Sequence, residues 1–110
     1  MTPVRFHESA RRERLQAKRR YTARDPRLAA RFDLALRHTI GRIREAPSQF
    51  PEHALLAVPT PTGSLFFAIR RALLPRPFPH LIFFYLREGA AIVLAIAHPR
   101  RRPSYWSTRR

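Results

Sequence analysis

The segment from Ile92 to Trp106, IVLAIAHPRRRPSYW, holds the densest group of residues that could do chemistry. An apolar run ends at His98, three arginines follow between two prolines, and Tyr105 and Trp106 close the segment. A titratable ring, fixed positive charge and two aromatic faces therefore lie near the end of one predicted strand, a common place for functional sites. This segment is the first candidate for binding or catalysis.

The chain also contains the residue types that a ribonuclease needs. Cleavage of RNA through its 2′-hydroxyl requires a base for that proton, a cation beside the phosphorane and an acid for the leaving oxygen. His98 or Glu88 could be the base, and His98 or Tyr105 the acid. The candidate phosphate-binding residues are Arg70, Arg71 and Arg101. Because arginine is abundant along the whole chain, this set does not establish a ribonuclease.

The residues of the tail also have structural interpretations. A histidine that closes an apolar strand commonly packs or hydrogen-bonds to order the chain after it, and we favour this interpretation of His98. The arginines at 100–102 disfavour a protonated imidazole, so a neutral ring is expected. Tyr105 and Trp106 could stack on nucleic-acid bases. Packing of both rings back on the sheet is the favoured prediction.

Two adjacent arginines, Arg70 and Arg71, lie in the next candidate region. Neighbouring strand positions point to opposite faces, so one arginine joins the more apolar face and needs a partner if it is buried. The other could reach a ligand, and a solvated strand edge explains the pair equally well. With the tail residues Arg100, Arg101, Arg102, Tyr105 and Trp106, they form the predicted partner-binding set.

Composition limits the kind of partner. The chain carries 22 Lys and Arg against 7 Asp and Glu, which gives a formal net charge of +15. Such a charge predicts an anionic partner, namely nucleic acid, an acidic protein or an anionic membrane surface. A chain of 110 residues can build one modest core, so we expect a single domain over residues 1–110.

Other chemistries are not indicated. Cysteine is absent, so disulfides and thiolate sites are excluded. The four remaining histidines have no ligand-like spacing with carboxylates, and neither a metal nor a cofactor is predicted. These histidines are His7, His38, His53 and His80.

No membrane segment or export signal is predicted. The amino terminus lacks the apolar stretch of a secretory signal. The apolar region Phe78–His98 is interrupted by Arg87 and Glu88, which favours a β-hairpin over a membrane span. We expect a cytoplasmic protein.

Periodicity predicts the elements that position these residues. Asp25 and Pro26 are typical of a helix start, and apolar residues then recur every three or four positions until Pro47 ends the helix. An irregular proline-rich connection is expected at 47–64, holding at most a short edge strand at 54–58. A basic tail is expected at 99–110. The other predicted elements are a strand at 3–7, a helix at 9–21, and strands at 65–74, 81–87 and 91–98, the last two joined by a Glu88-Gly89 turn.

In this order, several strings resemble the RelE/ParE superfamily of toxins from bacterial type II toxin-antitoxin systems, and specifically its ParE-like branch. They are VRFHESA from Val4, the stretch from Tyr21 through ARFDLAL to EAPSQFP, IRRALL from Ile69, FPHLIFFY from Phe78, and the segment that ends at Trp106. His80 stands where the family often has tyrosine. The resemblance implies an α+β fold with a short N-terminal strand and a two-helix hairpin packed on an antiparallel sheet of about four strands.

The resemblance also implies partners. A cognate, acidic antitoxin would bind and neutralise the toxin, in a hetero-oligomer or beside a toxin homodimer. ParE-like members act on DNA gyrase, whereas RelE-like members cut mRNA on the ribosome. Arg70 corresponds to a recurrent arginine of the family. Three hypotheses therefore stand: a gyrase-binding toxin, which is favoured, a ribosome-dependent mRNA endonuclease, and a non-toxic nucleic-acid-binding or decayed toxin domain.

Overall fold

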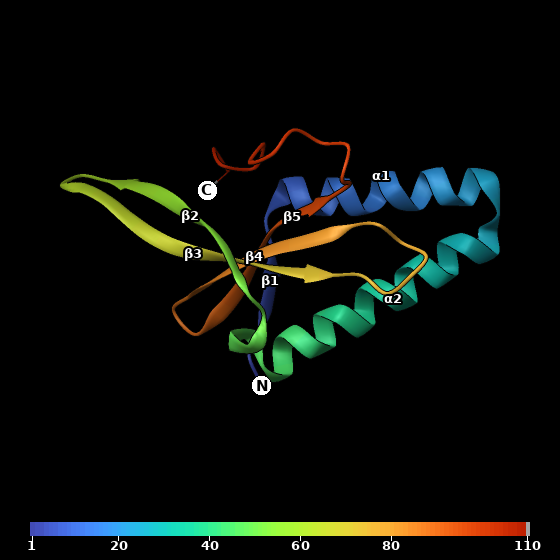
Figure 1. Ribbon diagram of the computed structural model, residues 1–110, viewed down its shortest axis with the longest axis horizontal. Helices are drawn as coiled ribbons and strands as arrows, with labels where there is room; N and C mark the ends of the chain where they lie inside the picture. Colours follow the sequence, from blue (N-terminus) through green and yellow to red (C-terminus); the bar gives the residue numbers. More distant parts are fainter. Residues whose placement is uncertain (110) are drawn as a thin grey trace.

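The computed structural model describes residues 1–109 and shows an α+β fold, as predicted (Figure 1). An N-terminal strand precedes two helices, and a meander of strands follows. In chain order the elements are β1 (Val4–Phe6), α1 (Glu8–Arg24), α2 (Pro26–Glu45), the 3₁₀ turn η1 (Pro47–Gln49), β2 (Glu52–Thr60), β3 (Gly63–Leu73), β4 (Leu81–Arg87) and β5 (Ala90–Ala97).

Asp25 separates the two helices. Its backbone N–H donates to Tyr21 O at the end of α1, and its carboxylate accepts a hydrogen bond from Arg27 N in the first turn of α2. The prediction of the second helix is confirmed, and its apolar face is buried at Phe32, Leu36, Ile40 and Ile43. None of the helices within residues 1–109 is long and apolar enough to cross a membrane.

The sheet differs from the prediction of about four antiparallel strands. It has five strands in the order β1-β5-β4-β3-β2 and is mixed, because β1 pairs in parallel with β5 while the other pairs are antiparallel. The predicted Glu88-Gly89 turn is confirmed: both residues have positive φ, 51° and 78°, as a two-residue type I′ turn requires. The first part of β5, residues 91–93, therefore lies between β1 and β4, whereas its end has a strand partner only in β4.

The connection at 47–64 is more regular than predicted. The edge strand expected at 54–58 is present and longer, because β2 is a nine-residue edge strand that pairs with β3 from Glu52 to Thr60. Pro59 is compatible with the strand because edge strands tolerate a residue without an N–H. The turn is confined to the residues before Gly63, whose φ of 147° favours glycine.

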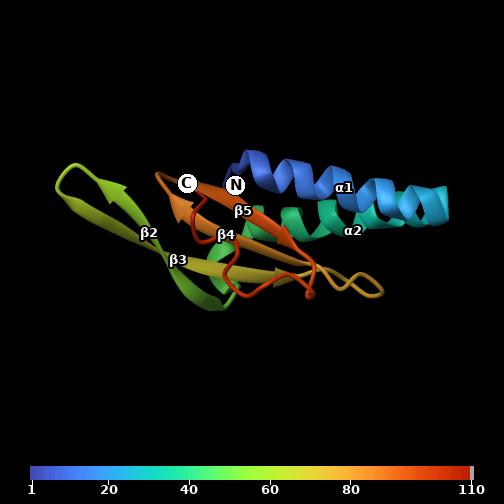
Figure 2. The ribbon, with the colours of Figure 1, turned by 90° about the horizontal axis from the view of Figure 1, so that it is seen from above.

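The sheet has a core on each face. The helix-side core packs α1 and α2 on residues such as Ile82 and Phe84, whereas the tail-side core packs the C-terminal segment on residues such as Phe83 and Tyr85. Because successive strand residues point to opposite faces, the alternating aromatic residues of β4 supply both cores. Figure 2 shows the two helices side by side along the sheet. The chain after β5 thus covers the face that the helices leave open.

The β2–β3 hairpin extends away from the helices at one end of the molecule (Figure 1). Leu55 and Phe66 lie on this hairpin and are 68% and 65% exposed. The hairpin adds to the longest dimension of the protein, 50 Å.

Candidate functional site

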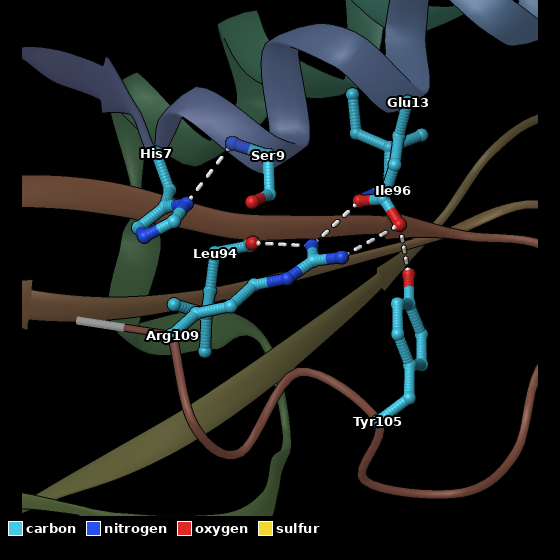
Figure 3. A network of polar contacts seen from close by, with 7 residues as sticks. All are labelled: His7, Ser9, Glu13, Leu94, Ile96, Tyr105 and Arg109. Atoms are coloured by element: carbon cyan, nitrogen blue, oxygen red, sulfur yellow. Dashed lines mark hydrogen bonds and ion pairs between the residues drawn. The ribbon is translucent and has the colours of Figure 1, made fainter.

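A single carboxylate ties the C-terminal tail to the helical layer. Glu13 lies on α1, and Figure 3 shows Tyr105 and Arg109 of the tail converging on it beside β5. Arg109 donates from Nη1 to Glu13 Oε1 at 2.8 Å and from Nη2 to Oε2 at 3.1 Å. The amide of Ile96 donates to Oε1 at 3.0 Å, and the hydroxyl of Tyr105 donates to Oε2. This cluster, which we call the Glu13 cluster, joins α1, β5 and the tail.

The Glu13 cluster changes the chemistry available to Tyr105. Burial, together with the hydrogen bond to Glu13, raises the pKa of the Tyr105 hydroxyl well above its usual range. The guanidinium carbon of Arg101 lies 4.0 Å from the centre of the Tyr105 ring. The hydroxyl is therefore a protonated donor already engaged by a carboxylate, which makes it a poor proton source for a leaving group.

His98 follows β5 and lies beside a second histidine. The rings of His98 and His80 meet edge to face with centres 5.4 Å apart. The amide of Arg100 donates to His98 Nδ1 at 3.1 Å, so the tail turns around this ring as the structural interpretation predicts. His80 is 3% exposed and packs against Phe32 of α2. The sequence analysis set His80 aside because its spacing from the carboxylates is not that of a metal ligand, and no spacing rule links it to His98.

The two histidines line a basic pocket of about 520 Å³ between α1 and the start of the tail. Its other lining residues are Glu13, Gln16, Arg19, Arg20, Ile96, Arg100 and Arg101. A second hollow of about 480 Å³ adjoins it and shares His80 and His98 with it. We call the first hollow the basic pocket.

Both histidines favour the neutral state. Burial, with smaller effects from His98 and Arg20 outweighing that of Glu13, lowers the pKa of His80 from 6.5 to about 4. Burial and the nearby Arg100 and Arg20 lower the pKa of His98. The predicted neutral ring at position 98 has the expected electrostatic cause, although burial contributes more than the arginines do.

The depressed pKa of His80 predicts a pH-dependent stability. Between pH 6.5 and about 4 the imidazole of His80 is protonated in the unfolded chain but neutral in the folded protein. The free energy of unfolding therefore falls as the pH is lowered through this window. The His80 contribution is roughly 2 to 3 kcal/mol at most. Urea titrations from pH 4 to 7 measure it. His80→Phe should flatten the profile, and the exposed control His53→Gln should not. An unchanged slope in His80→Phe would contradict the assignment.

Arg70 and Arg71 lie on β3, do not line this pocket, and differ from each other in their surroundings. Arg70 Nη1 donates to Phe50 O at 2.7 Å and to Ser48 O at 3.2 Å, and Nη2 lies 3.3 Å from a Glu52 oxygen. Arg71 is exposed. The structure therefore uses Arg70 to hold η1 and the start of β2, and it leaves Arg71 open to solvent.

Arg70→Ala is expected to lower the free energy of unfolding by about 1 to 2 kcal/mol, because a partly buried carbonyl at Phe50 loses its donor. Arg71→Ala, which removes the same charge from the adjacent exposed position, should change it by less than about 0.5 kcal/mol. Chemical denaturation of the two variants measures the difference. Equal effects would show that the contacts of Arg70 to Ser48 and Phe50 carry no stability.

The remaining predicted residues divide between surface and core. Arg100, Arg101 and Arg102 are exposed. Trp106 is 1% exposed, in the tail-side core, with its ring centre 5.4 Å from that of Phe83. The structure therefore brings His98, Arg100, Arg101 and Tyr105 together, leaves Arg70 and Arg71 elsewhere, and gives Trp106 no face for a ligand.

Residues 1–109 contain no group of three or more histidine, aspartate or glutamate side chains that could hold a metal ion. A family model described as the ParE toxin of the type II toxin-antitoxin system parDE matches residues 4–103. No curated protein matches the chain. The matched range includes β1, both helices, the whole meander and the first part of the tail. The resemblance seen in the sequence is confirmed: the chain belongs to the ParE toxin family of type II toxin-antitoxin systems.

Proposed function

We propose that this toxin acts by binding DNA gyrase, without cutting RNA itself, and that a cognate acidic antitoxin neutralises it. The observation that carries the proposal is that no two of the acid-base candidates His98, Glu88 and Tyr105 are both close together and free of structural contacts. Glu88 and His98 lie at opposite ends of β5, roughly 25 Å apart at the rise of a β-strand. A base and an acid for one phosphodiester must lie within hydrogen-bond reach of the same substrate.

The other candidates are occupied by structural contacts. Arg70 is hydrogen-bonded to backbone carbonyls at the far side of the sheet, and the hydroxyl of Tyr105 is held by Glu13. Neither group is available in the way that a phosphate clamp or a general acid must be. The non-catalytic mechanism of the ParE-like branch fits this arrangement better than ribonuclease chemistry.

The exposed arginines support binding by surface charge. Arg100, Arg101 and Arg102 follow one another on an exposed turn, and the whole chain carries +15. Such a surface speeds encounter with an acidic partner, and a disordered acidic segment that folds on it would satisfy many of these charges. Antitoxin and gyrase would then compete for the same arginines.

A supercoiling assay with purified gyrase tests the proposal. The toxin should inhibit supercoiling of relaxed plasmid, and the triple variant R100A/R101A/R102A should lose at least about tenfold in potency, as loss of several charged contacts predicts. The matched control R31A/R37A/R44A removes three exposed arginines of α2. Full gyrase activity at molar excess of folded toxin would overturn the proposal, and so would equal losses in both triple variants.

A ribosome-dependent endonuclease remains the second candidate because the basic pocket holds a histidine pair beside arginines. Toeprinting of mRNA in a cell-free translation reaction distinguishes it. Gyrase binding predicts no new cuts on translating ribosomes, whereas codon-positioned cuts that vanish in His98→Gln would establish the nuclease. Unimpaired growth on induced expression would favour a non-toxic domain over both.

A further inference from the structure

The basic pocket has positive charge that no internal contact neutralises. Arg19, Arg20, Arg100 and Arg101 line it, and none of them forms an ion pair within residues 1–109. The one carboxylate of the lining, Glu13, is already engaged by four hydrogen bonds. A surplus of guanidinium groups in a concave site is suited to an anion with several acceptor oxygens.

We propose that the basic pocket binds the phosphate group of a nucleotide. A phosphate monoester offers three acceptor oxygens and nearly two negative charges, whereas a carboxylate side chain offers two oxygens and one charge. Four uncompensated arginines match the phosphate more closely. The proposal does not rest on gyrase binding, although Arg100 and Arg101 of the lining also belong to the arginines proposed to bind the antitoxin or gyrase.

The adjoining hollow is the proposed binding site for the nucleoside part of the ligand. Arg20, His80, His98 and Arg100 belong to both hollows, so a phosphate held by Arg20 and Arg100 lies at their junction. From there the second hollow runs along α1 past Ala17, Tyr21 and Ala23. An aromatic ring and small apolar side chains offer a base a stacking and packing surface. Each hollow falls in the usual size range of small-ligand sites, about 300 to 1,000 Å³.

The tautomer of His98 also favours a phosphate ligand. Its Nδ1 accepts a hydrogen bond from the amide of Arg100, so the neutral ring carries its proton on Nε2. Nε2–H is then a donor for an anion. The ring is surrounded by His80, by Arg20 of α1 and by Arg100 of the tail, and an incoming phosphate would offset the positive field of the two arginines.

Calorimetric titration of the full-length protein at constant ionic strength tests the site, with AMP and inorganic phosphate as probes. We expect saturable binding of one AMP per chain, tighter than inorganic phosphate. R20A/R100A should raise the AMP Kd at least about tenfold, since each charge-assisted hydrogen bond is worth a factor of this size. The control R37A/R44A, which removes two exposed arginines of α2, should change it by less than about twofold.

Several outcomes would overturn the assignment. Heats that never saturate with either probe would exclude the site, and equal weakening by both double variants would reduce it to general electrostatic attraction. Equal affinity for AMP and inorganic phosphate would show that the nucleoside does not bind in the second hollow. If R20A/R100A does not fold, amide and imidazole NMR shifts of the wild-type protein decide. AMP must then perturb Arg20, His98 and Arg100, and shifts scattered over α2 would contradict the proposal.

A further comparison identifies the source of the nucleotide. A short oligonucleotide with a 5′-phosphate and the same strand with a 5′-hydroxyl differ only in the group that the pocket is proposed to bind. Tighter binding of the 5′-phosphorylated strand than of AMP would support a strand end as the ligand, and the reverse order would support a free nucleotide. Identical affinity of the two strands, with no loss in R20A/R100A, would overturn the phosphate assignment.

Discussion

Glu13→Ala is expected to lower the free energy of unfolding by about 3 kcal/mol, because it leaves the Arg109 guanidinium without its counter-charge in a site that is largely closed to water. The side chains of Arg109 and Glu13 are only 14% and 11% exposed, and the pair is bidentate. The amide of Ile96 and the hydroxyl of Tyr105 lose their acceptor as well. Urea denaturation followed by the fluorescence of the single tryptophan, Trp106, measures the effect.

The matched control is Glu8→Ala on the same helix. Glu8 lies 4.0 Å from Arg12, and both side chains are about 70% exposed, so the loss should stay below about 0.5 kcal/mol. Trypsin should also cleave the tail at Arg100–Arg102 faster in Glu13→Ala than in Glu8→Ala, since the tail loses its attachment to α1. Equal stability and equal cleavage of the two variants would show that the Glu13 cluster does not hold the tail.

Glu13 could not have been found from the sequence. It stands in a strongly basic helix with few buried residues, and its partners lie 83 to 96 residues further along the chain. No spacing rule acts over such separations. His80 was missed for the same reason, since it precedes β4 whereas its neighbour His98 follows β5.

Local signals predicted the parts of the fold that local physics determines. The Asp25 carboxylate caps the helix by accepting from Arg27, two residues on, and successive residues of the buried face, Phe32, Leu36 and Ile40, are four positions apart. The structure has both features as predicted. The turn at Glu88-Gly89 needs only two residues with positive φ. Such elements depend on interactions between residues close in sequence, so they can be predicted from a single sequence.

Pairing with a neighbouring strand accounts for both differences from the predicted sheet. The three residues of β1 reach β5 only because both helices fold back between them, and the parallel pairing has no local signature. In β2 the prolines signalled a loop, but the pairing of Leu56 with Phe67 opposite outweighs them on an edge strand. Tertiary contacts, which the sequence does not display, decided the state of both segments.

The C-terminal tail divides into an exposed part and a part that packs on the sheet. Its arginines at 100–102 face solvent, whereas Tyr105, Trp106 and Arg109 hold it to the rest of the molecule. Substitution of the first set tests binding, and substitution of the second set tests folding. A loss of toxicity in a tail variant identifies a binding residue only if the variant keeps the stability of the parent.

Trp106→Ala is expected to lower the free energy of unfolding by about 3 to 5 kcal/mol, the largest effect of any single substitution in the tail. The side chain is 1% exposed and packs with Leu56, Phe83 and Leu94, so its removal leaves a cavity between the tail and the sheet. Small proteins are stable by only about 5 to 15 kcal/mol, and the variant can therefore be largely unfolded at 37 °C. Circular dichroism measures the loss, because the variant has no tryptophan.

Two further variants keep this prediction informative. Trp106→Phe retains a ring against Phe83 and should recover more than half of the lost stability. Phe66→Ala removes an aromatic ring that is 65% exposed on the β2–β3 hairpin, and it should change the melting temperature little. If Trp106→Ala melts with the parent while losing gyrase inhibition, the tryptophan binds a partner and the tail does not depend on it for folding. If it melts early and Trp106→Phe restores both stability and inhibition, burial of this ring is what presents the arginines at 100–102.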